Sequence, residues 1–143
     1  NVYGPHQRFD AYGNVIPIFT FKMLRGEAIQ VFGDGEQTRD FVNVNDIVQA
    51  NMKAAQAKGL SGVFNIASGT QITINQLIRD LSEASNVNPS IEYQKPRVGD
   101  VRDSLADISA AKHAFDYCPR IKLKKGLEEY CEWASSELET TIA

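Results

Sequence analysis

The stretch "AIQVFGDGEQTRDFVNVNDIVQA", residues 28–50, decides the fold class because its composition changes from strand-like to helix-like. Its runs "AIQVF" and "RDFVNV" are rich in β-branched and aromatic residues, and "GDGEQ" joins them. Asp34-Gly35 tolerates positive φ, so we expect a β-hairpin between the two runs, with the glycines serving the turn. Asn45 then caps an expected helix whose small and apolar residues recur on one face, namely Ile47, Ala50, Ala54 and Ala57.

The clearest helix signal outside this stretch covers residues 74–85. The segment "TINQ", from Thr73 to Gln76, has capping-box spacing, and apolar residues follow at i, i+3, i+4 and i+7. Further helices are expected at Asn14 to Arg25, from Asp107 or Ser109 to Phe115, and at 123–139, with strands at "NVYG", "VFNIA" and "SIEY". The sequence therefore predicts a mixed α/β fold.

The bulk composition excludes several classes of function. The chain has 143 residues, is 43% hydrophobic and carries a net charge of −3, so it can bury a core and lacks the positive charge of a general nucleic-acid or anionic-membrane surface. Its apolar runs are too short to span a bilayer. Two cysteines without a Cys-x-x-Cys pair and two scattered histidines support neither a disulfide framework nor a metal site. We expect a soluble, cytoplasmic protein.

Polar residues in the expected loops are the candidates for binding. Arg39 could hold a phosphate through paired charge-assisted hydrogen bonds, or it could be an exposed strand-edge arginine paired with Asp40 or Glu36. Arg97 and Asp100, in "PRVGD", could hold a pyrophosphate and a sugar hydroxyl, or they could form a solvated turn.

The segment "GNVIP" offers a third candidate. A helix that starts at Asn14 leaves backbone N–H groups free for an acceptor, and Val15 and Phe19 offer apolar surface for a flat ring. The alternative is that both side chains belong to the core.

No catalytic group accompanies these binding candidates. The 143 residues contain no Gly-x-Gly-x-x-Gly fingerprint, no P-loop lysine, no tyrosine followed four residues later by lysine, and no Ser, His and Asp set typical of a nucleophile system. The candidate residues therefore predict a binding function without an evident catalyst.

Five segments in order carry a resemblance to a known family: "NVYGPHQ", "NVIPIF", "IQVFGDGEQTRDFVNVNDIVQA", "VFNIASGTQITINQL" and "RVGDVRDSLADISAAK". Together they resemble the C-terminal half of the extended short-chain dehydrogenase/reductases that act on nucleotide sugars, above all the UDP-glucose and UDP-N-acetylglucosamine 4-epimerases. The resemblance runs from Asn1 to the last helix. It implies a chain that is a single fragment, residues 1–143, whose N-terminal NAD-binding Rossmann domain lies upstream.

The resemblance also implies a UDP-sugar site. In such a site Asn1, Arg39 and Arg97 contact the diphosphate, Asp100 the ribose, and Gln30 and Phe32 flank uracil, partly through backbone groups. The remaining residues that it implies line the pocket: Asn14, Val15, Phe19 and Ile74. It implies no metal, and it places NAD and the Tyr-x-x-x-Lys catalyst in the absent domain, so the fragment alone should be inactive.

The resemblance leaves three functions open. The first is C4 epimerisation of a UDP-sugar through a 4-keto intermediate, the second a nucleotide-sugar dehydratase or decarboxylase reaction, and the third a non-catalytic binding module. It further implies that "NVYG", "VFNIA" and the helix at 45–57 belong to the Rossmann domain. Without that domain they would expose an apolar face, so we expect self-association of the fragment, and a homo-oligomer for the parent.

Overall fold

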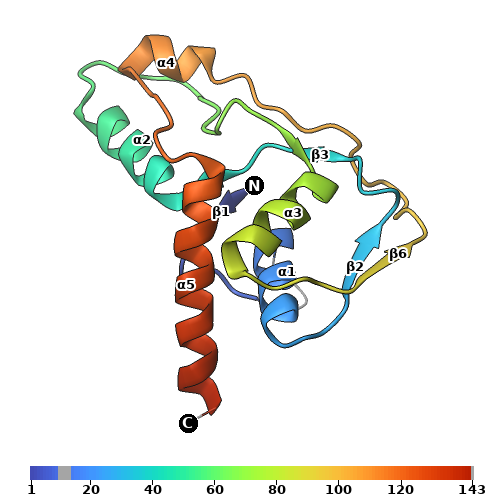
Figure 1. Cartoon of the computed structure of the whole chain (residues 1–143). Coiled ribbons are helices and arrows are strands. Elements are labelled where there is room, and N and C mark those ends of the chain that lie inside the picture. The colour runs from blue at the N-terminus through green and yellow to red at the C-terminus, as the bar shows by residue number, and fades with distance from the viewer. Residues whose placement is uncertain (10–13, 143) are drawn as a thin grey trace.

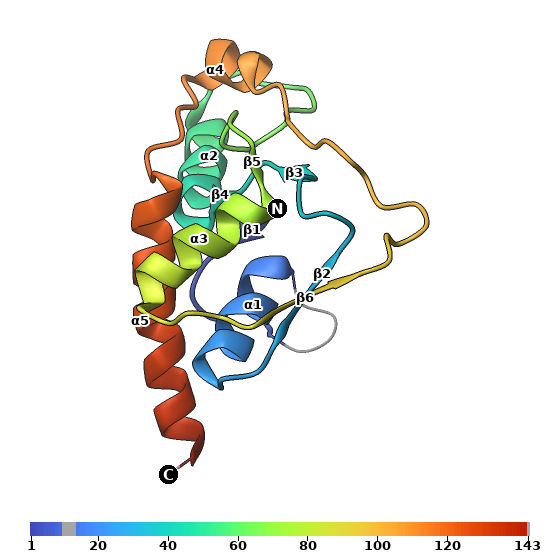
Figure 2. The same cartoon turned by 45° about the vertical axis from the view of Figure 1, so that its right-hand side comes forward.

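The computed structural model describes residues 1–9 and 14–142, which form an α/β structure (Figures 1 and 2). Its helices are α1 (Val15–Leu24), α2 (Val44–Gln56), α3 (Ile74–Ser85), α4 (Ser109–Phe115) and α5 (Leu123–Ile142). Its strands are β1 (Val2–Tyr3), β2 (Ile29–Phe32), β3 (Thr38–Arg39), β4 (Val42–Asn43), β5 (Ile72–Thr73) and β6 (Ile91–Gln94).

The strands pair in three two-stranded sheets, and the predicted hairpin is wrong. β2 pairs in parallel with β6, from Ile29 opposite Ile91 to Phe32 opposite Gln94. β3 pairs antiparallel with β5, and β1 pairs in parallel with β4. The runs "AIQVF" and "RDFVNV" therefore do not pair with each other, although the glycines between them form the expected turn, with φ of 87° at Gly33 and 76° at Gly35.

Hydrogen bonds from α3 stabilise this turn, so it forms although the strands on either side of it do not pair with each other. The Asn75 backbone N–H donates to the Gly35 carbonyl at 2.9 Å, and its side-chain amide donates to the Asp34 carbonyl at 3.0 Å. A Cβ atom at Gly35 would lie 2.1 Å from Asn75 Oδ1, so only glycine fits. The Tyr93 hydroxyl on β6 donates to the same Oδ1 at 3.0 Å, which ties the turn to the β2–β6 sheet.

The main core lies where α1, α3 and α5 pack together beside β2 (Figure 2). Phe21 of α1, Leu77 and Leu81 of α3, and Leu127 of α5 are at most 1% exposed. A second cluster joins α2 to α4 and the loops beside them, through Ala50, Ala111 and Tyr117. The small residues of α2 thus pack against α4 and the loops beside it.

The helix predictions hold except for two details of capping. Thr73 Oγ1 accepts from the Gln76 N–H at 3.0 Å, as the capping box predicts for α3. The cap of α2 is Asn43, whose side chain accepts from the Asn45 N–H at 2.9 Å, so Asn45 is the donor and not the cap. α4 has Ile108 at its cap position, while Asp107 accepts from the Ser109 N–H at 2.8 Å.

The predicted strand "VFNIA" is wrong, because residues 63–67 form no strand. Phe64 packs edge-on against Phe115 with ring centroids 5.3 Å apart, while Val63 is 98% exposed. None of the three described sheets includes this segment, and a strand needs a partner strand. Val48 and Met52 on α2 and Val2 on β1 are further exposed apolar side chains.

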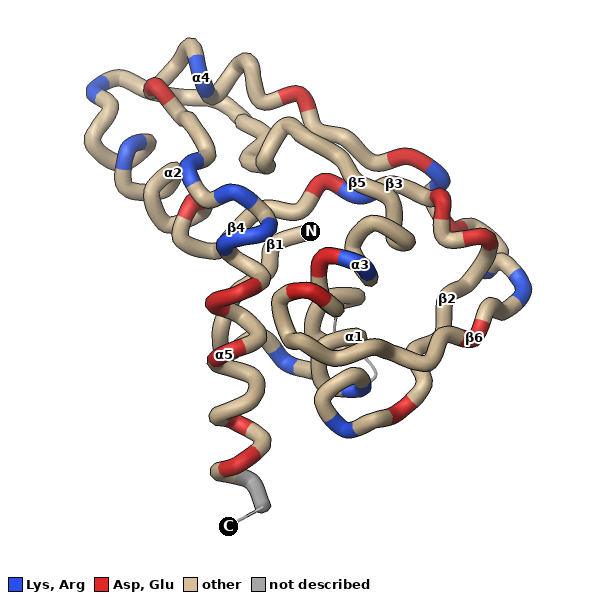
Figure 3. Tube along the Cα trace, in the orientation of Figure 1, with Lys and Arg blue, Asp and Glu red and all other residues tan. Residues whose placement is uncertain are grey.

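The charges of the described residues do not favour one face. Figure 3 shows acidic and basic residues intermixed along the segment between β6 and α4 and over the helices. Of the helices described, none combines the length and apolarity needed to cross a bilayer.

Asp40, directly after β3, joins two loops to the centre of the chain. Asp40 is 4% exposed, and its carboxylate accepts from the backbone N–H groups of Ser68 at 2.9 Å, Gly69 at 3.1 Å and Ala106 at 3.4 Å. The Ser68 hydroxyl donates to it as well. One side chain therefore positions the loop before β5 and the loop before α4.

We predict that Asp40→Ala lowers the free energy of unfolding by about 3 kcal/mol, because it leaves three partly buried backbone N–H groups without their acceptor. Ser68→Ala, which removes one donor, should cost about 1 kcal/mol. Urea denaturation measures both, with the exposed Glu27→Ala as the control. Equal midpoints for Asp40→Ala and Glu27→Ala would contradict this role.

Candidate functional site

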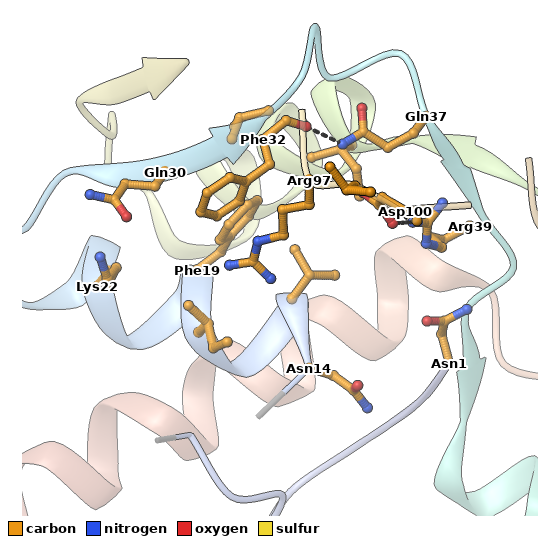
Figure 4. A pocket seen from close by; sticks show the side chains of 16 residues that line it. Asn1, Asn14, Phe19, Lys22, Gln30, Phe32, Gln37, Arg39, Arg97 and Asp100 are labelled. Atoms are coloured by element: carbon orange, nitrogen blue, oxygen red, sulfur yellow. Dashed lines mark hydrogen bonds and ion pairs between the residues drawn. The ribbon is translucent and has the colours of Figure 1, made fainter. Parts of the chain in front are cut away.

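All ten residues singled out from the sequence line one cleft of about 660 Å³ (Figure 4). It lies between α1, β2, β3 and the loop after β6. The ten residues are Asn1, Asn14, Val15, Phe19, Gln30, Phe32, Arg39, Ile74, Arg97 and Asp100. The chain thus brings together side chains from positions 1 to 100.

One face of α1 forms the apolar wall of the cleft. Val15 and Phe19 lie on this face, as do Ile18 and Lys22, which sequence reasoning missed. The four residues follow the i, i+3, i+4, i+7 spacing of one helix face, so this spacing could have found the missing two. Phe19 is 5% exposed and also belongs to the main core, so the binding and the packing interpretations both apply to it.

An unpaired edge of β2 forms the opposite wall. Ile29 N–H donates to Ser90 and Gly33 N–H donates to Gln94, both at 2.9 Å, so the odd-numbered residues of β2 face β6. The backbone groups of Gln30 and Phe32 must point the other way, because direction alternates along a strand. The Phe32 carbonyl accepts from Gln37 Nε2 at 2.7 Å.

This edge presents a fixed order of hydrogen-bonding groups. The Phe32 carbonyl is bound by Gln37, and no described residue binds the three other groups of this edge: the Gln30 N–H, the Gln30 carbonyl and the Phe32 N–H. Along the strand they read donor, acceptor, donor. Gln37 was not found from the sequence, because its partner is a backbone atom and leaves no pattern of residue types.

Arg39 lies at the other end of the cleft and is held by the loop after β6. Its Nη2 donates to Asp100 Oδ1 at 2.7 Å, and its Nη1 donates to the carbonyls of Val101 and Thr38, both at 2.7 Å. Its side chain is 16% exposed. The alternative in which Arg39 is an exposed edge residue paired with Asp40 or Glu36 is therefore wrong: it is mostly buried, and its partner is Asp100.

Neighbouring contacts dock the rest of this loop. Thr38 N–H donates to the Arg102 carbonyl at 2.8 Å, and Thr38 Oγ1 donates to Asp103 Oδ1 at 3.0 Å. Arg102 also pairs with Asp34 across the turn at 2.7 Å, and its hydrogen bond lowers the pKa of that carboxyl group. Residues 97–103 are all exposed, and the Asp100 N–H donates to the Arg97 carbonyl at 3.2 Å, so the predicted solvated turn is present and these contacts dock it on β3.

Arg97 covers the ring of Phe32 between the two ends of the cleft. Its guanidinium carbon lies 3.7 Å from the ring centroid, which is a cation–π contact. Of the carboxylates that the structure describes, none pairs with it. A guanidinium in this state can still donate several hydrogen bonds to an anion.

The cleft can hold an elongated ligand with a planar end and an anionic part. Figure 4 shows Lys22 and Gln30 at one end, Phe19, Phe32 and Arg97 in the middle, and Arg39 and Asn1 at the other end. Asn1 Nδ2 donates to the Asp40 carbonyl at 3.3 Å, which fixes its position near Arg39. Within residues 1–9 and 14–142, no group of three His, Cys, Asp or Glu side chains could hold a metal ion.

Comparisons with known proteins find the chain similar to epimerases and related enzymes. Residues 1–67 match the model of the "NAD dependent epimerase/dehydratase family". The chain is 41% identical to a crystallised UDP-glucose 4-epimerase from Thermotoga maritima, solved with UDP-glucose; the match covers all of this chain and 45% of that one, with a TM-score of 0.89.

Two curated relatives are also similar to this chain over most of its length. A putative UDP-glucose 4-epimerase of Methanocaldococcus jannaschii is 35% identical over 98% of this chain and 45% of its own length. UDP-glucuronic acid decarboxylase 2 of Arabidopsis thaliana is 32% identical over 89% of this chain and 28% of its own length. The chain therefore spans less than half the length of the relatives it matches.

We predict that Asp100→Asn raises the affinity for inorganic pyrophosphate about two- to fivefold, because it frees Arg39 from a partly exposed ion pair. Isothermal titration calorimetry measures the change. Asp103→Asn is the matched control, since it removes a nearby charge that binds Thr38 and not Arg39. If both variants gain affinity for pyrophosphate equally, or if Asp100→Asn gains none, the Arg39–Asp100 ion pair does not compete with the anion.

Proposed function

Because the chain belongs to the NAD dependent epimerase/dehydratase family, we propose that it is the UDP-sugar-binding part of a 4-epimerase. The observation that carries this proposal is the order of groups in the cleft: a donor–acceptor–donor strand edge at one end and Arg39 at the other. Such a cleft fits a nucleoside diphosphate bound lengthwise.

The strand edge favours uracil over cytosine. The edge of uracil reads carbonyl oxygen, N–H, carbonyl oxygen, which complements the Gln30 N–H, the Gln30 carbonyl and the Phe32 N–H. Cytosine replaces one carbonyl by an amino group and the ring N–H by an acceptor, so two of its three groups would meet a like group. Thymine shares the pattern of uracil.

The arginine end suits the diphosphate and the ribose. Arg39 and Arg97 supply charge-assisted donors, and Asn1 supplies an amide beside them. Asp100 is the acceptor for a ribose hydroxyl, which requires that it leave Arg39 when the diphosphate arrives. The ligand thus replaces the Arg39–Asp100 ion pair by two contacts, one between its diphosphate and Arg39 and one between its ribose and Asp100.

The reaction that we propose for the longer protein is epimerisation at C4 of the sugar. Bound NAD would supply the redox chemistry, taking a hydride from C4 to give a 4-keto sugar and returning that hydride to the other face of C4. The residues of this chain hold the nucleotide while the sugar turns, and they supply neither the dinucleotide fingerprint nor the Tyr-x-x-x-Lys pair. We place both in an N-terminal Rossmann domain.

The exposed apolar residues support this division of the protein. Val2 is 39%, Val48 48%, Met52 57% and Val63 98% exposed, on β1, α2 and the segment after α2. The β1–β4 sheet has only two strands, and isolated sheets of this size are marginally stable. We propose that the Rossmann domain covers these residues and extends this sheet.

A second candidate activity is nucleotide-sugar decarboxylation or dehydration, which the similarity to the Arabidopsis decarboxylase favours. These reactions use the same kind of nucleotide site and differ in acid and base groups near the catalytic tyrosine. The third candidate function is a binding module without catalysis. The reading frame upstream of Asn1 discriminates, since a glycine fingerprint with Tyr-x-x-x-Lys excludes the module.

We predict that Arg39→Ala and Arg97→Ala each weaken UDP binding by the full-length protein by about 1.5–3 kcal/mol, or about ten- to a hundredfold. Calorimetry measures the change, and Arg79→Ala, on the exposed side of α3, is the control. Unchanged UDP affinity in both cleft variants would reject the diphosphate assignment.

We predict that the wild-type protein binds UDP at least about tenfold more tightly than CDP, because CDP opposes like groups at the strand edge. The same calorimeter gives both dissociation constants. Equal affinities would reject the base assignment while leaving the arginine assignment intact, since the two nucleotides share their diphosphate.

A further inference from the structure

Lys22 is a cleft residue that the assignments above leave without a role. It lies one turn after Phe19 on the face of α1 that lines the cleft. Its side chain is half-buried, and its Nζ donates to the Ala28 carbonyl at 3.3 Å. The described part of the chain offers it no carboxylate partner. An ammonium group has three donors, so this one long hydrogen bond leaves two for a ligand.

The Ala28 carbonyl shows where the amine sits relative to the strand edge. Ala28, Gln30 and Phe32 are alternate residues, so their backbone groups share the edge that faces away from β6. Two residues of a strand span about 6.6 Å. The amine of Lys22 is therefore fixed at the start of the donor–acceptor–donor edge, one strand period before Gln30, and Figure 4 shows Lys22 and Gln30 at the same end of the cleft.

We propose that Lys22 is a specificity-determining residue whose amine donates a hydrogen bond to a ring carbonyl oxygen of the nucleobase. The proposal rests on the nucleotide-binding function. A base whose ring N–H donates to the Gln30 carbonyl and one of whose carbonyls accepts from the Phe32 N–H places its other carbonyl toward Ala28. The Lys22 amine and the Gln30 N–H then both donate to this second carbonyl oxygen. A base with an amino group in place of this carbonyl would be disfavoured, because the amino group would face the Lys22 cation.

Two plainer roles make different predictions. If Lys22 only supports the connection between α1 and β2 through Ala28, its loss lowers stability and weakens all ligands alike. If it only adds positive charge to the cleft, its loss weakens inorganic pyrophosphate as much as UDP. If Lys22 instead donates a hydrogen bond to one carbonyl of the base, the affinity lost on its removal depends on whether that carbonyl oxygen is present.

A double-mutant cycle tests the contact in the full-length protein, with calorimetry as the measurement. Its protein arms are wild type and Lys22→Met, which keeps the length and apolar stem of the side chain. Its ligand arms are UDP, 2-thio-UDP and 4-thio-UDP, because sulfur is a weaker acceptor than oxygen. We expect Lys22→Met to weaken UDP about five- to tenfold, and one thio analogue much less, with pyrophosphate binding unchanged.

Lys58→Met, an exposed lysine outside the cleft, is the matched control and should change none of these affinities. The proposal is overturned if Lys22→Met weakens UDP and both thio analogues by one common factor, if it weakens pyrophosphate equally, or if it changes nothing. In each of these cases wild-type binding of UDP still supports the proposed function. Wild-type protein that binds no UDP would overturn both.

Discussion

The parallel pairing of β2 with β6 is the constraint on which the rest of the site depends. It turns Ile29, Val31 and Gly33 toward the partner strand and leaves the backbone of Gln30 and Phe32 facing α1. A shift by one residue would reverse both sets, because the direction of backbone groups alternates along a strand. The same pairing places the end of β6 beside Phe32, so the chain that follows carries Arg97 over its ring.

The loop after β6 carries the cleft from its aromatic middle to its cationic end. It returns along β3, where Thr38 binds both Arg102 and Asp103 and where Arg39 binds Asp100. Arg39 is thereby positioned before any ligand is present, since three of its hydrogen bonds are made within the chain. An arginine that is already ordered loses little conformational freedom when an anion replaces Asp100.

Local sequence rules predicted the helices and the turn but not the pairing of the strands. Thr73 and the apolar spacing after it were enough for α3, because a helix and its cap are made from neighbouring residues. Asp34 and Gly35 indicated a turn correctly, yet β2 pairs with residues some sixty positions further on, about which a turn carries no information. The residues 63–67 looked like a strand for the same local reason and lack a described strand to pair with.

The grouping of the candidate residues in one cleft follows from the ordered set of segments and not from local patterns. Alone, Arg39 and Arg97 were ambiguous, and only the ordered set of segments placed them beside Asn1 and Asp100. That set named the cleft but missed Lys22, although Lys22 lies seven residues after Val15 on the same helix face. Residues that hold others in place, such as Gln37 and Asp40, act on backbone atoms and leave no signal in a sequence.

The proposed function also gives a position for the sugar. If the base lies at Lys22 and Gln30 and the diphosphate at Arg39, the sugar extends past Asn1 and Asn14. Those two residues also line an adjoining hollow of about 530 Å³, formed by residues 1–7 and Val44. Val2, on the wall of that hollow, is one of the exposed apolar residues that we assign to the contact with the Rossmann domain. On the proposed function, the reacting carbon therefore lies where the contacts of this chain end and those of the catalytic domain begin.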